Sequence, residues 1–283
     1  MGTEAEMMDL VLSVARKDDR VRGVILNGSR ANPNAKKDRF QDYDIVYLVT
    51  DVQLFKQDPD WIDVFGERMI LQLPDDMQSP SPQPHDGYVY LMQFMDGNRI
   101  DLTLYPKEKV GDIIQDSLSV LLLDKDGVIP LLEPASEKTY LPKPPTRKEF
   151  DDCCNEFWWV CPYVAKGLRR GEILYAKYML DQVIREQLMK MLTWYIGLQT
   201  IYTINPGKFG KHFDRYLPAD LWELVLETYA GAGYEENWKA LEVMGRLFRR
   251  VAVVVADKYG FAYSELEDEC VSKFIHTIRG YNN

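Results

Sequence analysis

The chain lacks an apolar segment long enough to cross a membrane. Its longest aliphatic run, 251–256, has six residues, whereas a spanning helix needs about 20. A basic-then-apolar stretch is also missing near the amino terminus, because Glu4, Glu6 and Asp9 interrupt it. We therefore expect a cytoplasmic protein that does not engage a membrane.

Cysteine and histidine are scarce. Cys153, Cys154, Cys161 and Cys270 show no C-x-x-C spacing, and three of them lie in one helical pattern. The three histidines are scattered along the sequence. These patterns indicate reduced thiols in or near the core, and they favour neither a zinc site nor a nucleophile of the Cys–His type.

Excess positive charge is missing as well. The formal net charge is -10, and residues 1–145 carry most of it, with 25 acidic against 16 basic side chains. Binding to a polyanion draws its affinity from clustered Lys and Arg, so nucleic acid is not the expected partner. An acidic field would instead attract a cationic small molecule.

The remaining composition is that of a folded protein, with 46% hydrophobic and 28% charged residues. A length of 283 residues favours two domains. Prolines gather between 130 and 145, and a capping box at Thr146-x-x-Glu149 then begins a helix. We predict an α+β fold with a mixed-sheet domain over 1–145 and an all-α bundle over 146–283. Strands are expected at 24–26, 45–49, 88–95 and 99–105, and helices at 4–15, 60–66, 108–116, 147–170, 172–198, 218–230, 235–259 and 263–279.

A turn and an acidic pair mark the candidate site. Gly28, Ser29 and Arg30 follow the first predicted strand, and the missing side chain of Gly28 permits a tight turn. Asp42 and Asp44 are two residues apart, so on a strand they leave the same face with origins roughly 7 Å apart. Asp101 is expected on the polar face of another strand, where it can supply a third carboxylate.

Three close carboxylates repel one another unless a cation lies between them, and magnesium prefers such oxygen ligands. Two magnesium ions could activate an attacking hydroxyl and neutralise a leaving pyrophosphate, while Gly28 and Ser29 hold the outer phosphates and Arg30 adds charge. In this arrangement Asp101 is a general base, a metal ligand or both. The pattern predicts magnesium-dependent nucleotidyl transfer.

The sequence resembles the polymerase-beta type nucleotidyltransferase superfamily, and over both domains it is similar to the bacterial aminoglycoside 6-adenylyltransferases, also called streptomycin adenylyltransferases. The similar stretches are 6–9, 28–30, 40–45, 100–104, 122–126 and 149–158. The resemblance implies transfer of AMP from ATP to the 6-hydroxyl of streptomycin, and hence antibiotic resistance. It matches Gly28, Ser29, Asp42, Asp44 and Asp101 to phosphate-holding and metal-holding positions. Asn27 departs from the aliphatic residue usual before that glycine.

Several alternatives share these residues. The same site could serve another aminoglycoside, another small hydroxyl compound or a protein hydroxyl. A regulator that binds nucleotide without catalysis would be expected to lose a carboxylate, yet all three are present. The sequence does not indicate an oligomeric state.

Residues beyond 145 supply weaker candidates. Glu149, Asp152 and Glu156 follow helical spacing along one edge of a predicted helix, so they could bind the cationic groups of an aminoglycoside or simply form a solvated face. Lys166 resembles a family position and could reach the triphosphate.

Overall fold

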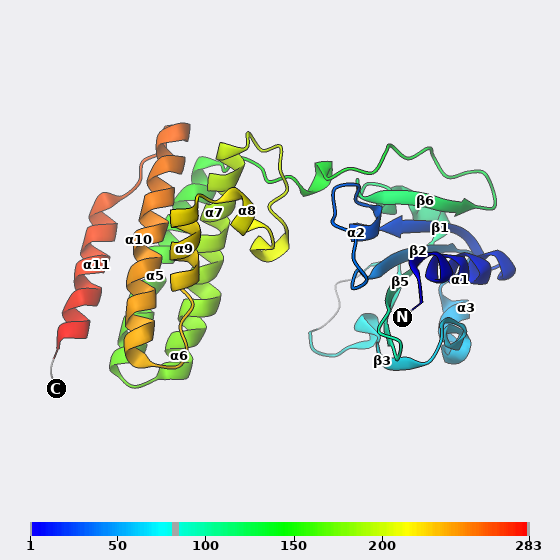
Figure 1. Ribbon diagram of the computed structural model, residues 1–283, viewed down its shortest axis with the longest axis horizontal. Helices are drawn as coiled ribbons and strands as arrows, with labels where there is room; N and C mark the ends of the chain where they lie inside the picture. Colours follow the sequence, from blue (N-terminus) through cyan, green and yellow to red (C-terminus); the bar gives the residue numbers. More distant parts are fainter. Residues whose placement is uncertain (1, 81–84, 282–283) are drawn as a thin grey trace. The chain divides into compact units, whose positions relative to one another are not determined.

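The computed structural model describes residues 2–80 and 85–281, which form two compact units, Met1–Thr139 and Tyr140–Asn283 (Figure 1). The first unit holds the β-sheet and the second is almost entirely helical. The predicted α+β class, with a mixed sheet followed by a helical bundle, is confirmed.

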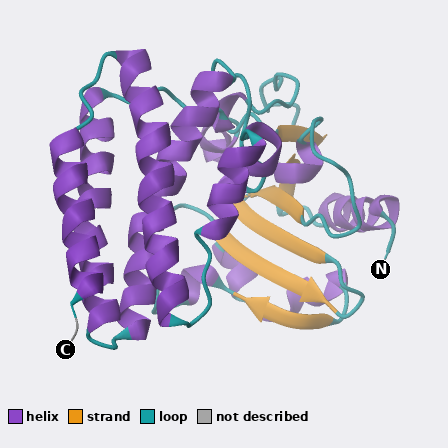
Figure 2. Ribbon diagram, turned by 60° about the vertical axis from the view of Figure 1, so that its left-hand side comes forward, coloured by secondary structure: helices purple, strands orange, loops and turns teal. Residues whose placement is uncertain are grey.

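A six-stranded mixed sheet organises the first unit, in the order β3-β4-β5-β2-β1-β6. Its strands are drawn in orange in Figure 2. Only the central β2·β5 pair is parallel among these neighbours, and the other four pairs are antiparallel. The strands are β1 (Val21–Asn27), β2 (Tyr43–Val49), β3 (Arg68–Gln72), β4 (Tyr88–Phe94), β5 (Arg99–Pro106) and β6 (Ser119–Asp124).

The two faces of the sheet differ in their packing. Helix α1 (Glu4–Lys17) begins at the predicted Thr3–Glu6 capping box and packs on one face, where Val11 and Tyr47 are fully buried. The opposite face carries a much smaller apolar cluster, with Ile25 and Leu48 among its members. Because side chains alternate along a strand, Asp44 lies on this second face with Val46 and Leu48. The thinly covered face is therefore the one with polar groups at the strand ends.

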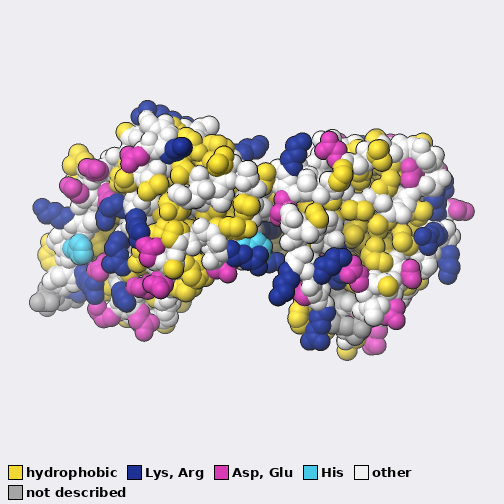
Figure 3. All heavy atoms as spheres, turned by 45° about the horizontal axis from the view of Figure 1, so that its top comes forward, with side chains coloured by type: hydrophobic (Ala, Val, Ile, Leu, Met, Phe, Trp, Pro, Cys, Tyr) yellow, Lys and Arg dark blue, Asp and Glu magenta, His cyan; other side chains and the backbone are white. Residues whose placement is uncertain are grey.

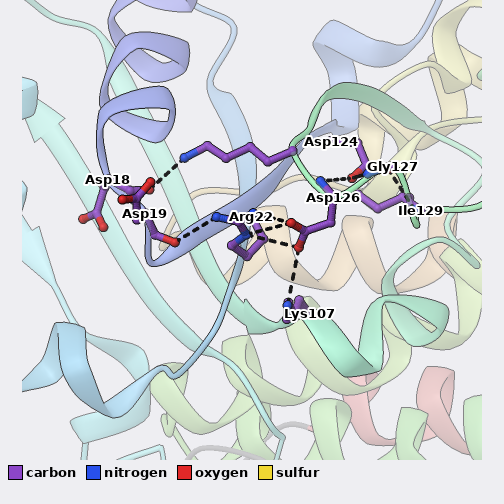
Figure 4. A network of polar contacts seen from close by, with 9 residues as sticks. Asp18, Asp19, Arg22, Lys107, Asp124, Asp126, Gly127 and Ile129 are labelled. Atoms are coloured by element: carbon purple, nitrogen blue, oxygen red, sulfur yellow. Dashed lines mark hydrogen bonds and ion pairs between the residues drawn. The ribbon is translucent and has the colours of Figure 1, made fainter.

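A polar network closes the far end of the same sheet (Figure 4). Asp124 accepts hydrogen bonds from the backbone amides of Gly127 at 2.8 Å and Ile129 at 2.9 Å, so it holds the turn after β6. Asp126 pairs with Arg22 on β1 and lies 3.4 Å from the Lys107 ammonium. The acidic residues of the 122–126 stretch therefore stabilise a corner of the sheet.

Short helical segments connect the strands or follow the last of them. They are α2 (Gly28–Ala31), α3 (Gln53–Lys56), η1 (Pro59–Phe65), η2 (Pro74–Asp76), η3 (Lys107–Lys109), α4 (Val110–Ile113) and η4 (Lys138–Tyr140). The helix predicted at 60–66 thus has the tighter 3-10 geometry, and the one predicted at 108–116 is a 3-10 turn followed by one turn of α-helix. β3 and β6 were not predicted, since both are sheet edges without an alternating pattern of buried side chains.

Long helices build the second unit around one apolar core. Phe157 stacks on Phe248 with ring centroids 3.8 Å apart, which joins its two longest helices. The predicted core thiols Cys153, Cys154 and Cys161 are buried and unpaired, whereas Cys270 is exposed. The elements are α5 (Arg147–Arg169), α6 (Ile173–Tyr178), the π-helical η5 (Met179–Ile184), α7 (Arg185–Gln199), η6 (Lys208–Gly210), α8 (Phe213–Tyr216), α9 (Ala219–Glu227), α10 (Tyr234–Tyr259) and α11 (Glu265–Gly280).

Surface charges are mixed. On the face of each unit seen in Figure 3, Lys and Arg side chains alternate with Asp and Glu. Among the helices of residues 2–80 and 85–281, none combines the length and apolarity needed to traverse a bilayer.

Candidate active site

The parallel pairing of β2 with β5 brings the predicted carboxylates together. Asp44 lies directly opposite Asp101 in this pair, and Asn27 of β1 lies opposite Asp44 on its other side. Asp42 immediately precedes β2, two residues from Asp44. Three acidic side chains predicted from two separate parts of the sequence therefore lie at one end of the neighbouring strands β2 and β5.

The glycine turn after β1 lies against this acidic end. Gly28 has φ +69°, a left-handed conformation that glycine adopts without strain. Its amide donates to the Leu118 carbonyl at 3.2 Å. A Cβ at Gly28 would lie only 2.2 Å from Oδ2 of Asp44, so the missing side chain makes room for that carboxylate. The residue is required both for the backbone turn and for the position of Asp44.

Arg30 ties the turn to the loop that carries Asp42. Its Nε donates to the Asp42 carbonyl at 3.1 Å, and its Nη2 donates to the Gln41 carbonyl at 2.7 Å. The guanidinium also stacks over the Tyr43 ring, and the side chain is only 4% exposed. Gln41 in turn donates to the Ser29 carbonyl at 3.2 Å. These contacts make Arg30 a positioning residue for Asp42, and its predicted contact with phosphate remains a prediction.

Asp44 lies in a poorly solvated place beside the other two carboxylates. Burial, followed by the nearby charges of Asp101 and Asp42, raises its pKa from 3.8 to about 6. The shift reflects negative charges forced close together in a poorly solvated place. Such an arrangement stores repulsion that a bound cation would relieve.

Arg99 partly compensates this charge. Its Nε and Nη2 atoms each donate to one oxygen of Asp101 at 2.7 Å, and Nη1 lies 3.3 Å from Oδ2 of Asp42. Over residues 2–80 and 85–281, no three His, Cys, Asp or Glu side chains are arranged as ready ligands of one metal ion. The donor set nevertheless fits magnesium in residue type, because it offers carboxylate oxygens from adjacent strands.

Asn27 finds a partner on the neighbouring strand. Its Oδ1 accepts a hydrogen bond from the buried Ser119 hydroxyl at 3.2 Å. This bond satisfies a polar side chain where an aliphatic residue was expected. Ser119 lies on the unpredicted strand β6, so the sequence offered no signal for the pairing.

The candidates of the second unit all lie on α5. Glu149 completes the capping box by accepting from the Thr146 amide and hydroxyl at 2.8 Å, bonds that lower its pKa. Asp152 pairs with Lys148, Glu156 is exposed, and the Lys166 ammonium lies 5.5 Å from the centroid of the Phe274 ring.

The sequence offers three helical tryptophans, Trp158, Trp159 and Trp194, as side chains that could stack on a sugar or adenine, although core positions are commoner for such residues. Trp159 is 61% exposed, whereas its neighbour Trp158 is buried. Helical spacing of three residues places Trp159 on the same edge as Glu156. Composition alone could not separate the two tryptophans, because helical aromatics are more often core.

The mixed sheet, the glycine turn and the paired carboxylates define a nucleotidyltransferase. A family model described as "Streptomycin adenylyltransferase" matches residues 1–278, and the chain belongs to this family. It is 42% identical to the aminoglycoside 6-adenylyltransferase of Bacillus subtilis (strain 168), over 98% of each chain. It is also 42% identical to a Campylobacter jejuni protein of that name, over 97% of this chain and 95% of the other. The predicted family is thereby confirmed.

A solved structure is similar over the same length. The crystal structure of an aminoglycoside 6-adenyltransferase from Bacillus subtilis covers 99% of this chain and 100% of its own, with 39% identity and a TM-score of 0.49.

Proposed function

We propose that this enzyme transfers AMP from ATP to the 6-hydroxyl of streptomycin in a magnesium-dependent reaction, and thereby confers resistance to the drug. The observation that carries the proposal is the register of β2 and β5, which sets Asp44 opposite Asp101 beside the Gly28 turn. The family match over residues 1–278 supports the adenylyl donor and the class of acceptor.

The proposed chemistry is an in-line displacement. The acceptor oxygen attacks the α-phosphorus of ATP, the bond from that phosphorus to the bridging oxygen breaks, and pyrophosphate leaves with the bond electrons. Magnesium held by Asp42, Asp44 and Asp101 would neutralise the charge that develops on the leaving group. The Gly28 turn presents Ser29, whose backbone amide and hydroxyl would hold the outer phosphates, while the Gly28 amide stays bonded to the Leu118 carbonyl. The proton of the acceptor hydroxyl passes to Asp101 if that carboxylate acts as the base.

The acceptor assignment is supported by charge. Residues 1–145 carry 25 acidic against 16 basic side chains, a field that favours a cationic drug over a nucleic acid. On α5, Asp152 and Glu156 are exposed carboxylates that suit guanidinium groups, with Trp159 on the same edge. Glu149 retains its proposed part in drug binding in addition to its role in the cap, and Lys166 is proposed to contact the triphosphate. Because ATP is the donor, we propose that the reaction takes place in the cytoplasm.

The test is turnover of α-labelled ATP and streptomycin by the full-length protein with magnesium. We expect labelled drug and pyrophosphate in equal amounts, with the new phosphodiester mapped to the 6-hydroxyl by NMR. Asp44→Asn should abolish turnover. Asp126→Asn is the matched control, because Asp126 lies in the same unit but pairs with Arg22 at the far end of the sheet.

Other aminoglycosides and a lincosamide serve as alternative acceptors in the same assay. Modification of one of these in preference to streptomycin would replace the proposed substrate while leaving the reaction type intact. A folded preparation that transfers no label to any acceptor would refute adenylyl transfer itself.

A further inference from the structure

The guanidinium of Arg99 lies between the two outer carboxylates of the candidate site. It holds both oxygens of Asp101 at 2.7 Å and approaches Asp42 at 3.3 Å. Arg99 and Asp101 are two residues apart on β5, so both side chains leave the same face of the strand. This bidentate fork matches carboxylate geometry better than a single hydrogen bond would.

The contact places a positive charge among three negative ones. Asp42, Asp44 and Asp101 contribute three negative charges at one end of the sheet, and the buried Arg30 is already bonded to two backbone carbonyls. Arg99 thus supplies the positive charge that contacts two of these carboxylates directly. The pair remains accessible to solvent, with side-chain exposures of 36% for Arg99 and 20% for Asp101.

We propose that Arg99 is the resident counter-ion of this carboxylate cluster, and that a divalent cation binds Asp42 and Asp101 by displacing its guanidinium. The inference rests on the proposed function, because it assumes that these carboxylates receive a metal. Arg99 is a positioning residue in this scheme: it keeps the carboxylates gathered in the metal-free enzyme and competes with the cation for their oxygens.

Competition has a measurable consequence. A cation that must break the charge-assisted hydrogen bonds of the guanidinium binds more weakly than one that need not displace it. Replacing Arg99 by a neutral side chain should therefore tighten cation binding, although the metal-free protein becomes less stable. A purely structural arginine would behave differently, since its loss would let the carboxylates move apart and would weaken the binding of the cation.

The experiment measures binding of Mn²⁺ to the full-length, chelator-treated protein, with the free ion counted by electron paramagnetic resonance. We expect Arg99→Gln to bind Mn²⁺ about tenfold more tightly than the wild type, because the cation no longer has to displace the guanidinium from its charge-assisted hydrogen bonds. Its melting temperature should also rise more on addition of Mn²⁺, because only the folded state binds the ion. Arg99→Lys keeps the charge but loses the fork, so its affinity should lie between the two.

Arg22→Gln is the matched control. Arg22 likewise pairs with a carboxylate of the same unit through two nitrogens, but its partner is Asp126, outside the cluster. It should lower stability without changing the affinity for Mn²⁺.

The outcomes separate the two hypotheses. Equal or weaker Mn²⁺ binding by Arg99→Gln and Arg99→Lys would overturn the counter-ion role and leave the proposed function standing. Absence of Mn²⁺ binding in every variant, even with ATP present, would overturn the role of Arg99 and magnesium-dependent transfer together.

Discussion

Substitution of Gly28 by alanine tests the contact between the turn and the acidic site. The change adds one methyl group where φ is +69° and where Oδ2 of Asp44 would be only 2.2 Å from the new carbon. Two penalties follow. The left-handed backbone costs a non-glycine residue about 1–2 kcal/mol, and relief of the overlap by shifting Asp44 costs roughly 1–3 kcal/mol more.

Gly127→Ala carries only the backbone penalty, so comparison with it isolates the penalty of the overlap with Asp44. Gly127 belongs to the same unit and has a similar φ of +64°, but a Cβ there has no neighbour within 4 Å. We therefore expect Gly127→Ala to lower the free energy of unfolding by about 1–2 kcal/mol. Gly28→Ala should lower it by roughly 2–5 kcal/mol, the sum of both penalties.

Hydrogen exchange read by mass spectrometry is the suitable assay, because a chain of two units need not unfold in one step. Exchange of the β1 and β2 amides reports the first unit alone. Turnover should fall about 100-fold in Gly28→Ala, since a displacement of about 1 Å at a reacting group costs that much. Equal destabilisation in both variants, with turnover preserved, would show that Gly28 does not determine where Asp44 lies.

Three other substitutions test the charges of the protein. Asp44→Asn removes a carboxylate whose pKa is raised to about 6 from 3.8. A raised acid pKa costs the folded state stability above pH 6 and nothing below pH 4. In chelator, the free energy of unfolding of the variant should therefore exceed that of the wild type by up to about 3 kcal/mol at pH 8. That advantage should vanish near pH 4 in urea titrations, and a difference independent of pH would contradict the assigned cause. Arg30→Gln leaves the Gln41 and Asp42 carbonyls without their donor, so we expect a loss of about 3 kcal/mol by hydrogen exchange in β2; unchanged exchange would argue against its positioning role. Glu156→Gln should raise KM for streptomycin about tenfold at constant kcat and stability, as the loss of one charge-assisted contact implies, and an unchanged KM would assign Glu156 to a solvated helix face.

Local features of the fold could be predicted because short-range chemistry determines them. Both capping boxes, at Thr3 and Thr146, begin helices as expected, since each needs only a hydroxyl and a carboxylate three residues apart. The hairpin of β4 and β5 follows from the Gly97 turn. Edge strands could not be predicted in this way. β3 is mostly exposed, so its sequence lacks the alternation of buried and exposed side chains that identifies a strand.

The sequence indicated which residues belong to the site more readily than it indicated what each of them contacts there. Spacing predicted that Asp42 and Asp44 leave one face of a strand, because alternation along a strand is a local property, but β2 begins only at Tyr43. It could not show that Arg30 would be buried under the Asp42 loop or that Glu149 would be engaged in a helix cap. A side chain's partners depend on which segments pack beside it.

By itself, the order of residues determined where most helices and strands form, which residue types could gather phosphate and cations, and to which family the chain belongs. Tertiary structure alone decided that β2 pairs in parallel with β5, so that Asp101 meets Asp44, and that Arg99 reaches both outer carboxylates. The physical reason is range: helix caps and strand alternation act within a few residues, whereas Asp44 and Asp101 meet only when strands from separate stretches of the chain are aligned in one sheet.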